Sequence, residues 1–150
     1  DPTLVPVLVA HLQEHCDRMG VCDRNGRIRL GVALEEALLN GMYHGNLQVS
    51  SDLKEDGGDA FQRLAARRRG EEPYSSRLLH IGVRVDDAGA SFVIRDEGPG
   101  FDVASLPDPT DPENLLRPSG RGLLLIRTFM DDVAHNPAGN EVTMVKKRKA

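Results

Sequence analysis

The sequence of 150 residues has few cysteines, no long hydrophobic run and no excess of positive charge. Its two cysteines, Cys16 and Cys22, match neither a CxxC motif nor the spacing of a zinc site, which argues against a disulfide scaffold. No apolar stretch approaches the ~20 residues that a membrane-spanning helix needs, and the chain opens with no secretory signal pattern. The net charge of −4 offers no broad basic field for nucleic acid or an anionic membrane.

The rest of the composition is that of an ordinary globular chain. Hydrophobic residues make up 39% of the sequence and charged residues 28%, which is typical of a soluble fold. The length predicts a single domain covering residues 1–150. We therefore expect a reduced, soluble, cytoplasmic protein that binds neither nucleic acid nor a membrane. Because the chain starts at Asp1 rather than at a methionine, a longer parent chain stays open.

Helical periodicity predicts two helices in the first third of the chain. The first covers residues 4–19, where apolar residues recur at steps of three and four: Val5, Val9, Leu12, Cys16 and Met19. Residues 22–26 are typical of a turn, and the second helix is predicted over residues 28–45. The polar residues 48–76, with a short helix over 60–69, are interpreted as a surface insertion.

Alternating apolar residues predict strands in the second half of the chain. Residues 81–86 and 91–95 form a hairpin, and a closing strand covers residues 142–147 after a turn at 137–140. The proline-rich residues 102–119 are predicted to be irregular, and a helix over residues 122–130 follows them. This order predicts an α+β fold, a two-layer sandwich with a mixed, mostly antiparallel sheet and helices on one face.

The second predicted helix carries a polar stripe. Glu36, Asn40 and His44 follow one another at steps of four, so they share one helical face. A carboxylate one turn from an amide can accept a proton while the amide offers an oxygen to a metal. Mg²⁺ needs few protein ligands when phosphates and water complete its shell. The alternative is an ordinary solvated helix face.

A glycine-rich segment follows the second predicted strand. Asp96 ends that strand, and Gly98 and Gly100 come directly after it. Glycine lets a backbone approach a flat ligand or a phosphate closely, and the Asp96 carboxylate can accept a hydrogen bond from an exocyclic amine such as that of adenine. The alternative is a plain turn.

A second glycine-rich segment opens the helix predicted over residues 122–130. It comprises Gly120, Arg121, Gly122 and Leu123. Free N–H groups and a partial positive charge make such a helix start a natural phosphate site, although simple capping explains it too. The chain has no GxxxxGK[ST] motif, which excludes a P-loop kinase, and the segment lacks the third glycine of a dinucleotide-binding fingerprint.

In this order, the three segments resemble the N, G1 and G2 boxes of the Bergerat-fold ATPases, also called GHKL or histidine-kinase-like ATPases. The run from Glu36 to Asn40 followed by His44-Gly45, and the two glycine-rich segments, are more closely similar to the anti-sigma-factor serine-protein kinases. Phe129-Met-Asp-Asp-Val133 also looks like that subfamily. The resemblance extends from the second predicted helix to the last strand.

The resemblance implies a role for each matching residue. Glu36 would be the general base for an attacking hydroxyl or water, Asn40 the one side-chain ligand of Mg²⁺, and His44 a neighbour of the phosphates. Asp96 would recognise the adenine amine. Gly98 and Gly100 would shape the base pocket, residues 102–119 would form an ATP lid, and the segment closing over the phosphates would be Gly120, Arg121, Gly122 and Leu123.

The resemblance also implies a function. We predict an ATP- and Mg²⁺-binding regulatory domain that phosphorylates a Ser or Thr of a small antagonist protein in a partner-switching pathway. Its expected partners are ATP and a sigma factor or an anti-anti-sigma protein, and a homodimer stays open.

Two alternatives to this kinase remain. One is a nucleotide-sensing module of a larger signalling protein, favoured because Asn140-Glu141 stands where the family commonly has Gly-Thr, with Thr143 two residues further on. The other is the catalytic domain of a histidine kinase, although His11 and His15 have no paired dimerisation helix.

Overall fold

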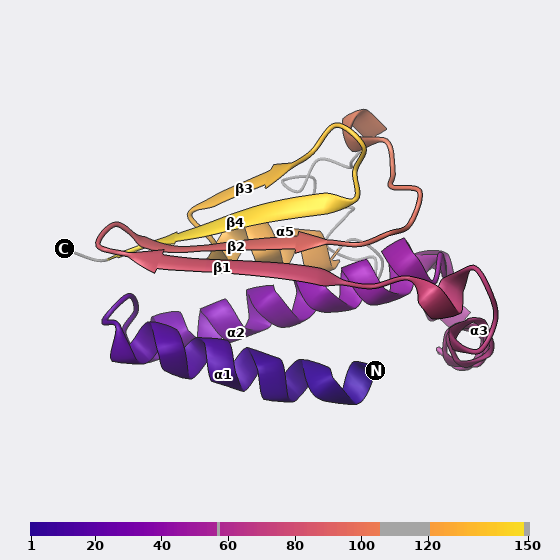
Figure 1. Cartoon of the computed structure of the whole chain (residues 1–150), viewed down its shortest axis with the longest axis horizontal. Helices are drawn as coiled ribbons and strands as arrows, with labels where there is room; N and C mark the ends of the chain where they lie inside the picture. The colour runs from indigo at the N-terminus through magenta and orange to yellow at the C-terminus, as the bar shows by residue number, and fades with distance from the viewer. Residues whose placement is uncertain (57, 106–120, 149–150) are drawn as a thin grey trace.

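The computed structural model describes residues 1–56, 58–105 and 121–148. In this part of the chain a four-stranded antiparallel sheet forms one layer and the main helices form the other (Figure 1). The two-layer α+β architecture predicted from the sequence is confirmed. Every strand pairing among the described residues is antiparallel.

Period-2 alternation explains how the sheet buries one face. In spatial order its strands are β1 (His80–Asp86), β2 (Gly89–Arg95), β4 (Glu141–Lys147) and β3 (Asp132–His135). Phe92 pairs with Val83 on one side and Met144 on the other, and both Phe92 and Met144 are completely buried. Side chains of paired residues point to the same face, so this row faces the helices. The predicted strands and hairpin turns are confirmed.

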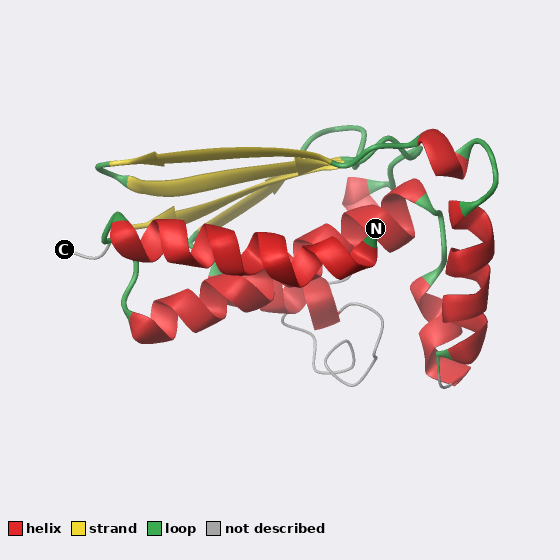
Figure 2. Ribbon diagram, turned by 60° about the horizontal axis from the view of Figure 1, so that its bottom comes forward, coloured by secondary structure: helices red, strands yellow, loops and turns green. Residues whose placement is uncertain are grey.

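Three helices cover that face of the sheet (Figures 1 and 2): α1 (Val5–Arg18), α2 (Arg24–Leu39) and α5 (Arg121–Phe129). A short 3-10 turn, η1 (Pro2–Leu4), precedes α1, and another, η5 (Val103–Ser105), follows β2. The core between the layers includes Val5, Val9, Leu12, Cys16, Leu30, Leu34, Leu38, Phe92, Ile94, Ile126 and Met144. None of the described helices is both long enough and apolar enough to cross a membrane.

The start of α2 and the end of α1 differ from the sequence prediction. The Asp23 side chain accepts a 2.7 Å hydrogen bond from the Gly26 N–H and caps α2, which begins at Arg24. Residues 24–26 therefore open a helix instead of forming a turn, because an N-cap aspartate and a turn aspartate look alike in sequence. Met19, predicted on the buried face of the first helix, ends that helix and is 45% exposed.

The last part of the predicted second helix is a π-helix, η2 (Asn40–Asn46). The Leu47 N–H donates to the Met42 carbonyl at 3.0 Å, which closes the wider i→i+5 turn. The predicted end of the helix at residue 45 lies one residue before the end of η2, but the backbone widens at Asn40. π-Helical turns are frequent at functional sites, and this one carries Asn40 and His44.

Residues 48–76 form a small packed unit at one end of the molecule (Figure 2). Its helical segments are η3 (Ser51–Asp56), α3 (Asp59–Arg69) and η4 (Tyr74–Ser76). Phe61 and Ala65 of α3 are buried against Leu47 and Val49, and Tyr43 of η2 packs on this cluster. The predicted short helix is confirmed, and the cluster attaches the segment to the end of the α2–η2 helix.

Candidate functional site

Asp96 lies directly after β2, where its carboxyl group is largely withdrawn from water. Only 9% of the residue is exposed, and its Oδ1 accepts a 2.9 Å hydrogen bond from the Gly98 N–H. The Asp96 N–H donates to the Asn140 carbonyl at 2.9 Å, which fixes the backbone. Burial raises the pKa of Asp96, while the Gly98 hydrogen bond and the Arg77 charge act in the opposite direction. The result is a buried acceptor held in one orientation.

Two glycines bring the π-helix η2 against Asp96. A Cβ at Gly45 would collide with the Asp96 carboxyl group, and a Cβ at Gly98 would collide with the Gly45 carbonyl oxygen. Because any larger residue would force these segments apart, glycine is required for their close approach. The predicted N-box and G1-box segments therefore meet at Gly45 and Gly98.

The start of α5 meets the polar stripe of α2. A Cβ at Gly122 would lie 2.5 Å from Glu36 Oε2 and 3.5 Å from Asn40 Nδ2, so the glycine backbone sits directly over these two side chains. Burial raises the pKa of Glu36, the nearby Lys54 charge lowers it, and Glu35 raises it further. A partly desolvated carboxylate, an amide and a helix N-terminus thus lie together.

His44 is tied to the 48–76 segment. Its Nδ1 lies 2.6 Å from the Val49 carbonyl oxygen, and its ring meets Phe61 edge-on at 5.9 Å between centroids. Burial lowers the pKa of His44, which favours the neutral ring. Since a carbonyl only accepts, Nδ1 carries the hydrogen and Nε2 is left as an acceptor. Its predicted place beside phosphates stays a prediction.

Gly100 packs against the turn between β3 and β4. It has a φ of 79°, and a Cβ there would collide with the Ala138 carbonyl. The Phe101 ring next to it meets His135 edge-on at 5.5 Å. Gly100 therefore shapes the loop after Asp96 by letting it approach this hairpin.

Not every residue predicted for the site is described by the structure. Gly120 and residues 106–119 of the predicted lid lie outside the described residues, and of Arg121 only the backbone is described. Leu123 lies half-buried in the first turn of α5. Asn140-Glu141 stands where the family commonly has Gly-Thr. There the Asn140 backbone carbonyl accepts a hydrogen bond from the Asp96 N–H.

Sequence reasoning missed Asn46, which joins the two predicted boxes. The residue is 6% exposed, and its Oδ1 accepts a 2.6 Å hydrogen bond from the Glu97 N–H. Its backbone carbonyl accepts a 2.8 Å bond from Arg77. Asn46 therefore fixes the position of the strand end next to Asp96. An asparagine directly after His44-Gly45 was the available signal.

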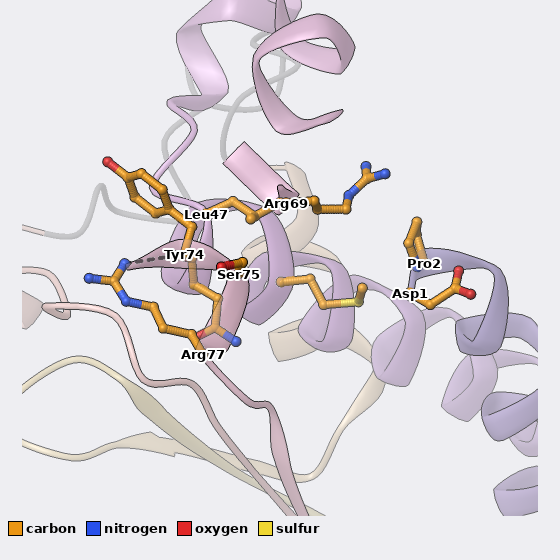
Figure 3. A pocket seen from close by; sticks show the side chains of 9 residues that line it. Asp1, Pro2, Leu47, Arg69, Tyr74, Ser75 and Arg77 are labelled. Atoms are coloured by element: carbon orange, nitrogen blue, oxygen red, sulfur yellow. Dashed lines mark hydrogen bonds between the residues drawn. The ribbon is translucent and has the colours of Figure 1, made fainter. Parts of the chain in front are cut away.

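A pocket of about 400 Å³ lies between η2, the N-terminus and the 48–76 segment (Figure 3). Its lining residues are Asp1, Pro2, Met42, Asn46, Leu47, Arg69, Tyr74, Ser75 and Arg77. None of the residues predicted for nucleotide binding lines it. The pocket shares Asn46 and Arg77 with the surroundings of Asp96 but includes neither Glu36 nor Asp96.

Comparison with protein families agrees with this geometry. The family model of the histidine kinase-like ATPase domain matches residues 1–146, a range that includes Glu36, Asn40 and Asp96. A comparison with curated proteins finds no match. Three observations are independent of the family match: the order of the three segments, the close approach of Gly45 to Asp96, and the meeting of Gly122 with Glu36 and Asn40. The chain therefore belongs to the histidine kinase-like ATPase domain family.

Proposed function

We propose that this domain binds ATP with Mg²⁺ and transfers the γ-phosphoryl group to a serine or threonine of a small antagonist protein, in a partner-switching pathway that controls a sigma factor. The observation that carries the proposal is the contact between Gly122 and Glu36 beside Asn40, on the same α2–η2 helix whose other end contacts Asp96. The α2–η2 helix thus carries Glu36, the proposed base for phosphoryl transfer, and also contacts Asp96, the proposed adenine-binding residue.

The Asp96 end suits a purine carrying an amino group. The carboxylate is buried and already accepts one hydrogen bond from Gly98, which leaves its other oxygen for an amine donor. A hydrogen bond to a charged acceptor away from water is stronger than a bond between neutral groups. The exocyclic amine of adenine is a donor of this kind, which supports ATP as the proposed nucleotide.

The Asn40 end suits a metal-bound triphosphate. The amide oxygen of Asn40 is the kind of ligand that Mg²⁺ prefers, and the first N–H groups of α5 are unpaired within that helix. Asn40 would hold the ion together with phosphate oxygens and water. When bound, Mg²⁺ neutralises charge on the phosphates, and the helix N-terminus favours the same anionic group.

Glu36 supplies the base. In the proposed step its carboxylate takes the proton of the partner's hydroxyl. The hydroxyl oxygen bonds to the γ-phosphorus as the bond from phosphorus to the β–γ bridging oxygen breaks, and ADP leaves. A carboxylate whose pKa is raised by burial is a better proton acceptor than an ordinary glutamate, provided that the pH stays above that pKa.

ATP binding and phosphoryl transfer give the primary test. At an ATP concentration of about 100 Kd with Mg²⁺, the domain should gain about 2.7 kcal/mol, because the ligand binds only the folded state. For a chain of this size the thermal midpoint should rise by about 5–10 °C. Label from γ-labelled ATP should appear on an antagonist protein encoded nearby. An unchanged midpoint with ATP contradicts the proposal, and label on His11 or His15 would indicate a histidine kinase instead.

A further inference from the structure

Lys54 reaches the site from the 48–76 segment. Its Nζ lies 4.8 Å from the centroid of the Phe61 ring, an arrangement in which the ring face attracts the ammonium group. Phe61 is only 2% exposed and is fixed in the cluster with Val49. The same ring packs edge-on against His44. A rigid aromatic side chain thus holds Lys54 next to the π-helix.

The charge of Lys54 acts on the phosphoryl-transfer end of the site. It lowers the pKa of both Glu36 and His44, so the ammonium lies within electrostatic reach of both side chains. At the other end, the positive charge that acts on Asp96 is Arg77. The charge of Lys54 therefore acts on Glu36, beside which the γ-phosphate would lie, and the charge of Arg77 acts on Asp96.

Among the described side chains, the Lys54 ammonium has no acidic partner within ion-pair distance. Lys54 itself is exposed. An ammonium group is a compact point charge on a flexible stem, which suits a phosphate oxygen.

The segment that carries Lys54 is firmly joined to the helix that carries Asn40. Arg68 of α3 donates to the carbonyls of Leu47 and Gln48. Arg77 donates to the Asn46 carbonyl at 2.8 Å and to Gln48 Oε1 at 2.7 Å. These bonds tie residues from both sides of the segment to the end of η2. The segment that carries Lys54 is therefore restrained relative to the helix that carries Asn40.

We propose that Lys54 is the cation that the 48–76 segment contributes to the active site and that it binds the terminal phosphate of ATP. This inference rests on the proposed function, because it needs a nucleotide between Asp96 and Glu36. It gives the segment a role in distinguishing ATP from ADP, since ADP lacks the phosphate that Lys54 contacts.

Titration calorimetry with Mg-ATP and Mg-ADP tests the inference. Lys54→Met should weaken ATP binding about tenfold, the loss of one charge-assisted contact, and change ADP binding by less than about twofold. Lys54→Arg should keep most of the ATP affinity. The matched control is Arg63→Met, which removes the same charge from an exposed position on α3 and should change neither affinity.

The outcomes separate this inference from the proposed function. Unchanged ATP affinity in Lys54→Met overturns the role of Lys54. An equal loss for ATP and ADP overturns it too, because it indicates a disturbed segment and not a lost phosphate contact. A wild-type domain that binds neither nucleotide overturns the proposed function and the inference together.

Discussion

Asp96→Asn should weaken ATP binding about 10- to 150-fold, the loss expected for a hydrogen bond to a charged group. The asparagine has the same shape, and its oxygen can still accept the hydrogen bond from Gly98 that the carboxylate accepts now. The second carboxylate oxygen, which is proposed to accept from the amine of adenine, is replaced by an NH2 group that only donates, so this hydrogen bond and the negative charge are both lost. Calorimetry with Mg-ATP measures the change.

The same substitution should leave the fold as stable or make it more stable. Burial raises the pKa of Asp96, so folding favours the protonated form. At pH values above this pKa the ionised carboxylate therefore costs stability, and a neutral asparagine removes that cost. Thermal unfolding at neutral pH should show an equal or higher midpoint. Loss of binding together with a gain in stability identifies a residue kept for function.

Asp132→Asn is the matched control for Asp96. This aspartate is exposed on β3 and lies 3.7 Å from Lys147, so the substitution removes the same charge from the surface. It should leave ATP affinity unchanged. If Asp96→Asn binds ATP within about threefold of the wild type, the predicted recognition of adenine by Asp96 is wrong.

The fold was predictable where local pattern decides the structure. The steps of three and four in α1 predicted one apolar helical face, on which Val9 and Cys16 are buried. The alternation over residues 91–95 predicted a strand with Phe92 and Ile94 on one face, and the structure buries both. Patterns of this kind involve only residues close together in the sequence, so they can be recognised without the tertiary structure.

Other features depend on contacts that the sequence pattern does not contain. Asp23 was interpreted as part of a turn because only its bond to the Gly26 N–H shows that it caps a helix. The 48–76 segment is polar in composition, which concealed the packing of Phe61 on Val49. Nor does the pattern show that Tyr43 of the π-helical turn packs on this cluster.

The candidate site, like the fold, was predictable from the sequence only in part. Residue types and spacing singled out Glu36, Asn40 and Asp96 as candidates, because carboxylates and amides at such spacing suit nucleotide binding. The meeting of Gly122 with Glu36 requires the folded chain, in which α5 lies across α2. The contact of Lys54 with the Phe61 ring was not predicted either, because it depends on how the 48–76 segment packs.

Glu36→Gln should lower phosphoryl transfer by about 10²- to 10⁴-fold, the contribution typical of a positioned general base. The amide preserves the shape of the side chain beneath Gly122 but cannot accept the proton of the hydroxyl. Because Glu36 is not assigned a contact with adenine or with Mg²⁺, ATP affinity should stay within about threefold of the wild type. Single-turnover transfer of label and calorimetry measure the two quantities.

The pH dependence of the reaction gives a second readout for the same residue. Burial raises the pKa of Glu36, and Glu35 adds to this while Lys54 opposes it. The base works only when ionised, so the wild-type rate should fall, as the pH is lowered, at a higher pH than for an ordinary glutamate with its pKa of 4.5. The small remaining rate of Glu36→Gln should lack this fall. Glu35→Gln, an exposed neighbour, should keep nearly the full rate and move the fall to lower pH. A wild-type rate as low as that of Glu36→Gln, together with tight ATP binding, would instead indicate a nucleotide-sensing module in which Glu36 performs no catalysis.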